Sequence, residues 1–213
     1  MNITAYPQTL ILIIANVIIS IIGFSNNDLI NKTILWPYGM KRENQWYRFI
    51  SSGFIHADFT HLLFNMFTFY FFGSAIEYYF TSYGLGGNIA YLALYFIGMI
   101  VADLPSYIKE QDNPHYKALG ASGAVSAVVF GCILFQHWGI ITVYIIPMPF
   151  IIYAIVYLVY CVYMSKRNMG NVNHDAHLWG SLFGLGFTIL LIILVNPELL
   201  QPILQELTHP HFV

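Results

Sequence analysis

The sequence predicts an all-α polytopic membrane protein, and its composition is the first reason. Apolar residues make up 58% of the chain and charged residues only 8%, with a mean hydropathy of +0.64. A soluble domain has about a quarter of its residues charged. Six apolar segments also recur along the chain, each near the length of about 20 residues that crosses the hydrocarbon core of a bilayer. We therefore expect a helical bundle inside a membrane.

The six expected spans form a single domain over residues 1–200, followed by a short tail at 201–213. They are placed at residues 7–24, 61–83, 88–104, 122–138, 147–164 and 177–195. The first span could instead be a signal peptide, but residues 1–8 contain no basic stretch and no A-x-A site follows, which favours retention. Pro147 and Pro149 are expected to mark the start of the fifth span, since proline is tolerated in a first helical turn.

The first loop, residues 25–60, is too long for a plain connector. It is rich in aromatic side chains, namely Trp36, Tyr38, Trp46, Tyr47 and Phe49. Aromatic rings among charged residues suit the headgroup depth of a membrane. We therefore expect a structured loop that lies partly on or in the membrane.

Three groups of polar residues are predicted to meet at one face of the membrane. With six spans, the second, fourth and sixth run in the same direction, so their leading ends share a face. His61 and Asn65 lead the second span, Ser122 the fourth and His177 the sixth. Polar groups at membrane depth are costly unless they are partnered. These side chains should therefore contact one another.

Small residues predict close packing between the fourth and sixth spans. They recur at every fourth position, as Gly123, Ala127 and Gly131 in the fourth span and as Gly180 and Gly184 in the sixth. Such stripes let two helix backbones approach closely in a membrane. Ser122 and His177 stand next to these stripes, so close packing would bring a hydroxyl and an imidazole within hydrogen-bond reach.

That arrangement is the one in which histidine acts as a general base and serine as a nucleophile. Acyl transfer also needs donors for the oxyanion of the tetrahedral intermediate. His61 and Asn65, four residues apart on one helix face, could supply them together with the Ser122 N–H. The flanking Gly120 and Gly123 let the backbone turn tightly beside the nucleophile.

The chain resembles the rhomboid family of intramembrane serine proteases between about Gln45 and Gly184. The shared motifs are Trp46-Tyr47-Arg48, Phe54-Ile55-His56, His61-Leu62-Leu63-Phe64-Asn65-Met66, Gly73 with Glu77, Gly120-Ala121-Ser122-Gly123, and Ala176-His177 with Gly180 and Gly184. The resemblance implies a six-helix rhomboid-like bundle of the basic bacterial type.

The resemblance also implies residue roles. Ser122 and His177 would form a catalytic dyad, with His61 and Asn65 stabilising the oxyanion and His56 shaping a hydrated cavity. Arg48 and the first loop would be structural, and Gly73 and Glu77 would organise the end of the second span. Substrates would enter laterally by movement of the fifth span and of a capping loop at residues 165–175.

Three positions depart from the family pattern or tempt a different assignment. Relatives often have Trp immediately before the arginine of the first loop, where this chain has Tyr47. Four residues after the nucleophile they often have an aromatic ring that packs on the catalytic imidazole, but here the residue is Ser126, so what orients His177 is open. Asp175 lies two residues from His177 and is expected to point elsewhere, as a loop or capping residue.

The basic residues give two opposite predictions of membrane orientation. All eight lie in loops that border the predicted active-site face, namely Lys32, Lys41, Arg42, Arg48, Lys109, Lys117, Lys166 and Arg167. The positive-inside rule would place that face in the cytoplasm. The resemblance implies a bacterial inner-membrane protein whose active site opens to the extracytoplasmic side, and we favour that orientation because the first loop looks folded.

The predicted function is hydrolysis of peptide bonds in or near transmembrane segments of membrane-protein substrates. Lipid is the other expected partner, and no nucleic acid or cofactor is expected. The alternatives are a transporter and a non-catalytic relative that binds client proteins. A metal enzyme is disfavoured because His174 and His177 belong to no H-E-x-x-H motif. Cys132 and Cys161 are interpreted as small buried apolar residues, with neither a disulfide nor a metal framework.

Overall fold

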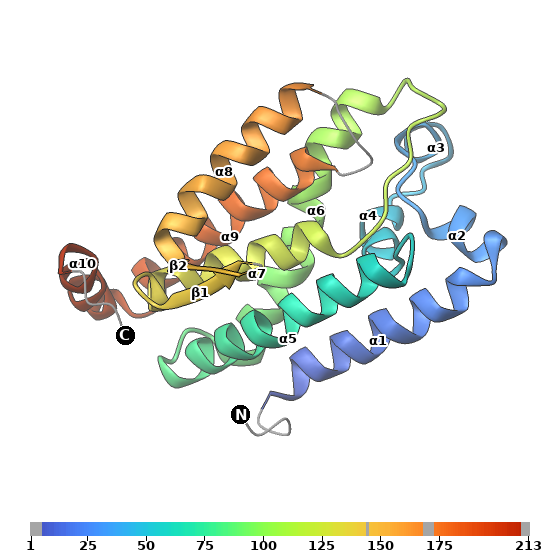
Figure 1. Cartoon of the computed structure of the whole chain (residues 1–213). Helices are drawn as coiled ribbons and strands as arrows, with labels where there is room; N and C mark the ends of the chain where they lie inside the picture. Colours follow the sequence, from blue (N-terminus) through green and yellow to red (C-terminus); the bar gives the residue numbers. More distant parts are fainter. Residues whose placement is uncertain (1–5, 144, 168–172, 210–213) are drawn as a thin grey trace.

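The computed structural model describes residues 6–143, 145–167 and 173–209 of a helical bundle (Figure 1). Parts of the predicted loop at 165–175 and of the predicted tail at 201–213 lie outside these residues. In chain order the elements are α1 (Pro7–Phe24), α2 (Asn27–Thr33), α3 (Pro37–Glu43), α4 (Arg48–Ser51), the 3-10 helix η2 (Ser52–Phe54), α5 (Phe59–Ser82), α6 (Gly87–Glu110), α7 (Ser122–Gln136), β1 (Ile140–Val143), β2 (Ile146–Pro149), α8 (Phe150–Arg167), α9 (His174–Val195), the 3-10 helix η3 (Pro197–Leu199) and α10 (Leu200–Thr208).

Five helices in the described part of the chain are long and apolar enough to cross a membrane, namely α1, α5, α6, α8 and α9. This confirms the predicted polytopic helical fold. The remaining predicted span is α7, which has 15 residues. At 1.5 Å per residue it is roughly 22 Å long, less than the ~30 Å hydrocarbon core. At least one end of α7 must therefore lie below the membrane surface.

The structure corrects the predicted start of the fifth span. Helix α8 begins at Phe150, and Pro147 and Pro149 lie in strand β2 instead. Strands β1 and β2 form an antiparallel hairpin in which Ile140 pairs with Pro149. Proline is tolerated in an edge strand because the missing N–H faces away from the partner strand. Pro147 and Pro149 therefore belong to the hairpin and not to the first turn of the following helix, where the sequence predicted them.

Two other boundaries differ from the predictions. Helix α6 runs through Pro105 to Glu110, although the predicted third span stops at residue 104. Proline is tolerated inside membrane helices, where neighbouring helices and local adjustments of the backbone compensate for the lost hydrogen bond. Helix α10 begins at Leu200 and takes up residues 201–208 of the predicted tail, and it lies beside the bundle (Figure 1). The Trp138 indole N–H donates to the Glu206 carbonyl at 2.9 Å and attaches this helix.

Helix α7 lies inside the bundle and packs closely on α9. A methyl group built on Gly180 would overlap the carbonyl of Gly123, and one on Gly184 would overlap the carbonyl of Ala127. The two backbones therefore touch without intervening side chains, as the glycine stripes predict. Contact at this distance is available only to glycine on the α9 side.

Glu77 joins α5 to the start of α1. Its buried carboxylate accepts hydrogen bonds from the backbone N–H of Gln8 at 3.0 Å, the backbone N–H of Thr9 at 2.9 Å and the Thr9 hydroxyl at 2.7 Å. The first N–H groups of a helix have no partner within the helix and carry a partial positive charge, so a carboxylate suits them. Gly73, one turn before Glu77, leaves room for the Thr9 methyl group.

The first loop is folded around Arg48. The guanidinium is 4% exposed and donates to the carbonyls of Asn31 at 2.9 Å and Ile34 at 2.7 Å. The neighbouring Leu35 and Ala118 exchange backbone hydrogen bonds at 2.9 and 3.1 Å. This bridge ties the first loop to the segment that leads into α7, so the loop helps to set where α7 begins.

We predict that Gly184→Ala destabilises the bundle by about 1–3 kcal/mol or more, because the new methyl group must push α9 away from the Ala127 carbonyl. Gly186→Ala is the matched control, since it lies on the same helix with no neighbour within 4 Å. Thermal unfolding in detergent micelles measures both. Equal unfolding temperatures for the two variants would contradict the proposed backbone contact.

Candidate active site

The leading ends of α5, α7 and α9 lie at the same end of the bundle (Figure 1). A methyl group built on Gly120, just before α7, would lie 2.7 Å from Cε1 of His61 in α5. One built on Gly123 would lie 3.7 Å from the Ala176 methyl group in α9. These contacts confirm that the three predicted leading ends share one face.

Gly120 makes the turn that starts α7. Its φ of +115° lies in a region that side chains with a Cβ atom rarely adopt, and the missing Cβ leaves space for the His61 ring. Its N–H donates to the Ser52 carbonyl at 2.9 Å. Any other residue at this position would strain the backbone and displace His61.

His56 joins α1 to the start of α7. Its ring is 1% exposed, its Nε2 lies 3.5 Å from the Ala121 N–H and its Nδ1 lies 2.9 Å from the Ser20 hydroxyl. Because the Ala121 N–H can only donate, Nε2 accepts and Nδ1 carries the hydrogen. The Ser20 hydroxyl then accepts from Nδ1 and donates to the Phe54 carbonyl at 3.1 Å. Burial, aided by the neighbouring His61, lowers the pKa of His56 to about 3.

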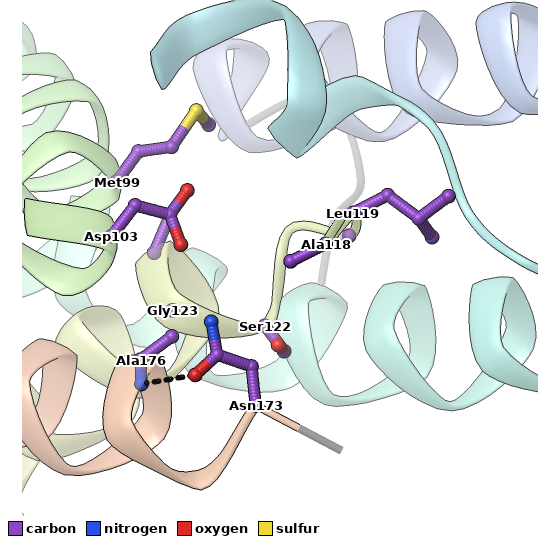
Figure 2. Close-up of a pocket in the computed structure, with 10 residues that line it drawn as sticks. Met99, Asp103, Ala118, Leu119, Ser122, Gly123, Asn173 and Ala176 are labelled. Carbon is purple, nitrogen blue, oxygen red and sulfur yellow. Dashed lines mark hydrogen bonds between the residues drawn. The ribbon is translucent and has the colours of Figure 1, made fainter. Parts of the chain in front are cut away.

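Ser122 is the first residue of α7 and lines a pocket with residues from α6 and α9 (Figure 2). The pocket is small, with a cavity volume of about 20 Å³, which is room for about one water molecule. Asp103 from α6 and Asn173, the N-cap of α9, are the other polar side chains that line it. Sequence reasoning missed both residues, although a single acid inside a predicted span was a signal for Asp103.

Tyr157 of α8 contacts the His177 ring. Its hydroxyl lies 3.0 Å from Nδ1 of His177, and the two rings are stacked with an interplanar angle of 17°. The same hydroxyl lies 3.4 Å from the Ser126 hydroxyl. In this chain, where position 126 is a serine, a tyrosine ring from α8 contacts the imidazole. Nothing in the sequence near Tyr157 signals this contact.

Ser122 and His177 stand next to contacting residues on the two touching helices. Ser122 precedes Gly123 and His177 follows Ala176, and the Cβ position of Gly123 lies 3.6 Å from the Ala176 carbonyl oxygen. Among the described residues, no hydrogen bond joins the two side chains. With Nδ1 of His177 facing Tyr157, its Nε2 is the nitrogen left for the serine.

The predicted oxyanion donors occupy the first two turns of α5. Asp58 caps this helix by accepting the His61 N–H at 2.8 Å. The Asn65 amide donates one hydrogen to the His61 carbonyl at 3.1 Å, which leaves its second hydrogen for another acceptor. The two side chains lie on one helix face as predicted, and neither hydrogen-bonds to Ser122 in the described part of the chain.

Asp175 points away from His177. It accepts a short hydrogen bond from the Ser165 hydroxyl of α8, and its other oxygen lies 3.9 Å from the Lys109 ammonium of α6. Asn173, rather than Asp175, caps α9 by accepting the Ala176 N–H at 3.1 Å. The prediction that Asp175 does not complete a triad agrees with these contacts.

Comparison with known proteins gives matches that cover most of the chain. The family model described as "Rhomboid domain" matches residues 43–194. The protein named "Putative rhomboid protease YdcA" of Bacillus subtilis (strain 168) is 31% identical over 148 residues, which are 70% of this chain and 68% of that protein. "Rhomboid-like protein 11, chloroplastic" of Arabidopsis thaliana is 30% identical over 149 residues, and the match covers 66% of this chain and half of that protein.

We predict that His56 makes the protein less stable as the pH falls from 7 to 5. Between its unfolded pKa of 6.5 and its folded pKa of about 3, the unfolded chain binds a proton that the folded protein does not. Stability is full above pH 6.5, and the loss at pH 5 is roughly 2 kcal/mol, at 1.36 kcal/mol per pKa unit. Thermal unfolding at both pH values should show a smaller loss in His56→Gln. An identical loss in the variant would contradict the assignment.

Proposed function

The chain belongs to the rhomboid family, and on that premise we propose that it is an intramembrane serine endopeptidase. It would hydrolyse peptide bonds in or near transmembrane segments of other membrane proteins. The observation that carries the proposal is the contact of α7 with α9 beside Ser122 and His177. A hydroxyl and an imidazole held on touching helices are the two groups that nucleophilic acyl transfer requires.

In the proposed mechanism, Nε2 of His177 takes the proton from Ser122 as Oγ attacks the peptide carbonyl. His61, Asn65 and the Ser122 N–H would donate to the oxyanion that forms. The imidazolium then gives its proton to the leaving amine, and the acyl group stays on Ser122. A water molecule, deprotonated by His177, releases the new carboxylate and restores the serine. The reaction needs no cofactor.

We propose that Tyr157 is a positioning residue for His177. For Nε2 to accept a proton, Nδ1 must carry a hydrogen, and the Tyr157 oxygen at 3.0 Å is placed to accept it. The Tyr157 hydroxyl can in turn donate to Ser126. This chain of hydrogen bonds would hold the reactive tautomer and stabilise the imidazolium, a role that Asp175 does not fill.

The short length of α7 supports chemistry below the membrane surface. A helix of 15 residues does not cross the hydrocarbon core, so Ser122 at its start can lie at membrane depth beside an open pocket. Transmembrane helices keep their carbonyls in backbone hydrogen bonds. A substrate must therefore unwind locally, which favours segments with small or helix-breaking residues near the surface.

We propose lateral entry of the substrate past α8. This helix is the least buried of the five long apolar helices, so its displacement exposes the least new surface. It also contributes Tyr157 to the site. Movement of α8 would therefore open a path for the substrate and change the surroundings of His177 together.

We propose that the active site opens to the extracytoplasmic side of a bacterial inner membrane. Three of the eight basic residues that argue against this orientation have structural partners. Arg48 is buried in the first loop, and Lys41 and Arg42 lie 3.0 and 3.6 Å from Asp112. The buried Arg48 therefore has a structural role in the first loop that explains its position without reference to membrane orientation.

A second candidate function is binding of membrane-protein clients without cleavage. It is favoured by the absence of a Ser122–His177 hydrogen bond among the described residues, and one matched relative is named rhomboid-like. A transporter fits less well, because transporters place polar groups near the midplane on interrupted helices. Here the polar residues gather at one end of the bundle.

We predict that a fluorophosphonate probe labels Ser122 in membranes or detergent. Labelling should fall by about 10²-fold or more in His177→Ala, because the serine loses its general base, and should vanish in Ser122→Ala. Ser25→Ala, at the exposed end of α1, is the control and should label like the natural protein. Gel fluorescence measures the label. Unchanged labelling in Ser122→Ala would refute the nucleophile, and no specific labelling at all would favour client binding.

We predict that Tyr157→Phe lowers kcat about fivefold for a transmembrane substrate and leaves KM unchanged. The ring still packs on His177, but the hydroxyl that accepts from Nδ1 is lost, and one such hydrogen bond is worth about 1 kcal/mol. Tyr153→Phe, one turn earlier on α8 and stacked on Tyr157, is the matched control. A larger KM with unchanged kcat would instead indicate a role in substrate binding.

A further inference from the structure

Three potential metal ligands converge beside the predicted general base. Cys161 of α8 and His174 and His177 of α9 each offer a ligand atom, and these atoms all lie within 4.8 Å of one another. His174 and His177 are three residues apart and share a helix face. Cys161 stands one turn after Tyr157 on α8, so it faces the same imidazole.

One ring nitrogen of His174 is buried without a hydrogen-bond partner among the described residues. The residue is 7% exposed, and its Nδ1 has no hydrogen-bond partner in the part of the chain that the structure describes. A buried polar nitrogen without a partner costs free energy. A bound cation would satisfy it, and this orphaned atom is independent of the spacing that defines the cluster.

The ligand set matches a borderline-soft cation. Thiolate and imidazole are the ligands that Zn²⁺ prefers, with bonds of about 2.3 Å to sulfur and 2.0–2.1 Å to nitrogen. Tetrahedral geometry with these bonds brings ligand atoms to about 3.5 Å from one another. Side-chain rotations that move the atoms inward by roughly 1 Å would close the site around the ion. Three protein ligands leave a fourth position for water.

We propose that Cys161, His174 and His177 form an inhibitory Zn²⁺ site. Binding would release the Cys161 thiol proton to water and form bonds to its sulfur and to one nitrogen of each imidazole. A neutral imidazole has a single lone-pair nitrogen. Once the metal holds that lone pair on His177, the other nitrogen carries a hydrogen and cannot accept the Ser122 proton. The ion would therefore inhibit the reaction by removing the base that activates Ser122, without binding to Ser122.

The site is near the polar end of the bundle. His174 is the first residue of α9, and Cys161 stands six residues, about 9 Å along the helix, before the end of α8 at Arg167. An aqueous ion would therefore reach it without crossing the hydrocarbon core. The metal would also hold α8 against α9, which opposes the movement of α8 proposed for substrate entry.

Metal binding can be tested without activity, by adding Co²⁺ to the purified Ser122→Ala protein in detergent. We expect one equivalent per chain to produce tetrahedral visible bands and a near-ultraviolet thiolate-to-cobalt band, and Zn²⁺ to displace it. The thiolate band should be lost in Cys161→Ser and retained in Cys132→Ser, whose thiol instead donates to the Phe72 carbonyl. A thiolate band that survives in Cys161→Ser, or no band at all, would overturn the site.

Inhibition rests on the proposed function and is tested separately, on the chain with Ser122 intact. We expect Zn²⁺ to slow fluorophosphonate labelling at least tenfold and a chelator to restore it. Cys161→Ser and His174→Gln should label normally without metal and need at least tenfold more Zn²⁺ to be inhibited, whereas His115→Gln should behave like the natural chain. Equal inhibition of all variants would overturn the proposal, as would Co²⁺ binding without any effect of Zn²⁺ on labelling. Co²⁺ binding in a chain that never labels would refute the protease and leave the metal site standing.

Discussion

The backbone contact between α7 and α9 is the constraint on which the rest of the structure depends. Gly180 and Gly184 let the carbonyls of Gly123 and Ala127 come so close that even a methyl group would not fit between the helices. In a membrane, lipid solvates apolar side chains as well as protein does, so helices associate through such close contacts rather than through apolar burial. Separating α7 from α9 by one side chain would also separate Ser122 from His177.

The polar network around the start of α7 supports this contact, because it fixes the position at which α7 begins. Gly120 turns the chain under His61, His56 receives the Ala121 N–H, and the first loop holds the approaching segment through Leu35 and Ala118. Each of these groups is paired at a depth where an unpaired one would be costly. Arg48 and Glu77 pair backbone groups in the same way farther from α7. The Arg48 guanidinium donates hydrogen bonds to backbone carbonyls, and the Glu77 carboxylate accepts hydrogen bonds from backbone N–H groups. Arg48 and Glu77 therefore support the fold that presents Ser122.

Helix α8 differs from these elements, because it contacts the His177 ring and is the least buried of the five long apolar helices in the described part of the chain. Tyr157 and Cys161 are one turn apart on α8 and both face the imidazole. A tyrosine hydroxyl favours the tautomer that a general base needs, whereas a thiolate with His174 would recruit a cation that removes the base. Under the proposed function and the proposed metal site, the same helix would supply both a hydrogen bond that favours catalysis and a ligand for the cation that stops it.

The sequence by itself determined the helical membrane fold, the face shared by three leading ends and the close packing of the fourth and sixth spans. These follow from local properties, namely hydrophobic length, the parity of the spans and small residues at every fourth position. Only the tertiary structure decided that Pro147 and Pro149 belong to a hairpin, because strand pairing depends on a partner elsewhere in the chain. It also decided which side chains of α8 lie beside His177. In the sequence, Tyr157 and Cys161 look like ordinary residues of an apolar helix. Their contact with α9 depends on how α8 is rotated about its own axis. Rotation of one helix against another is set by packing across the bundle, which no local pattern specifies.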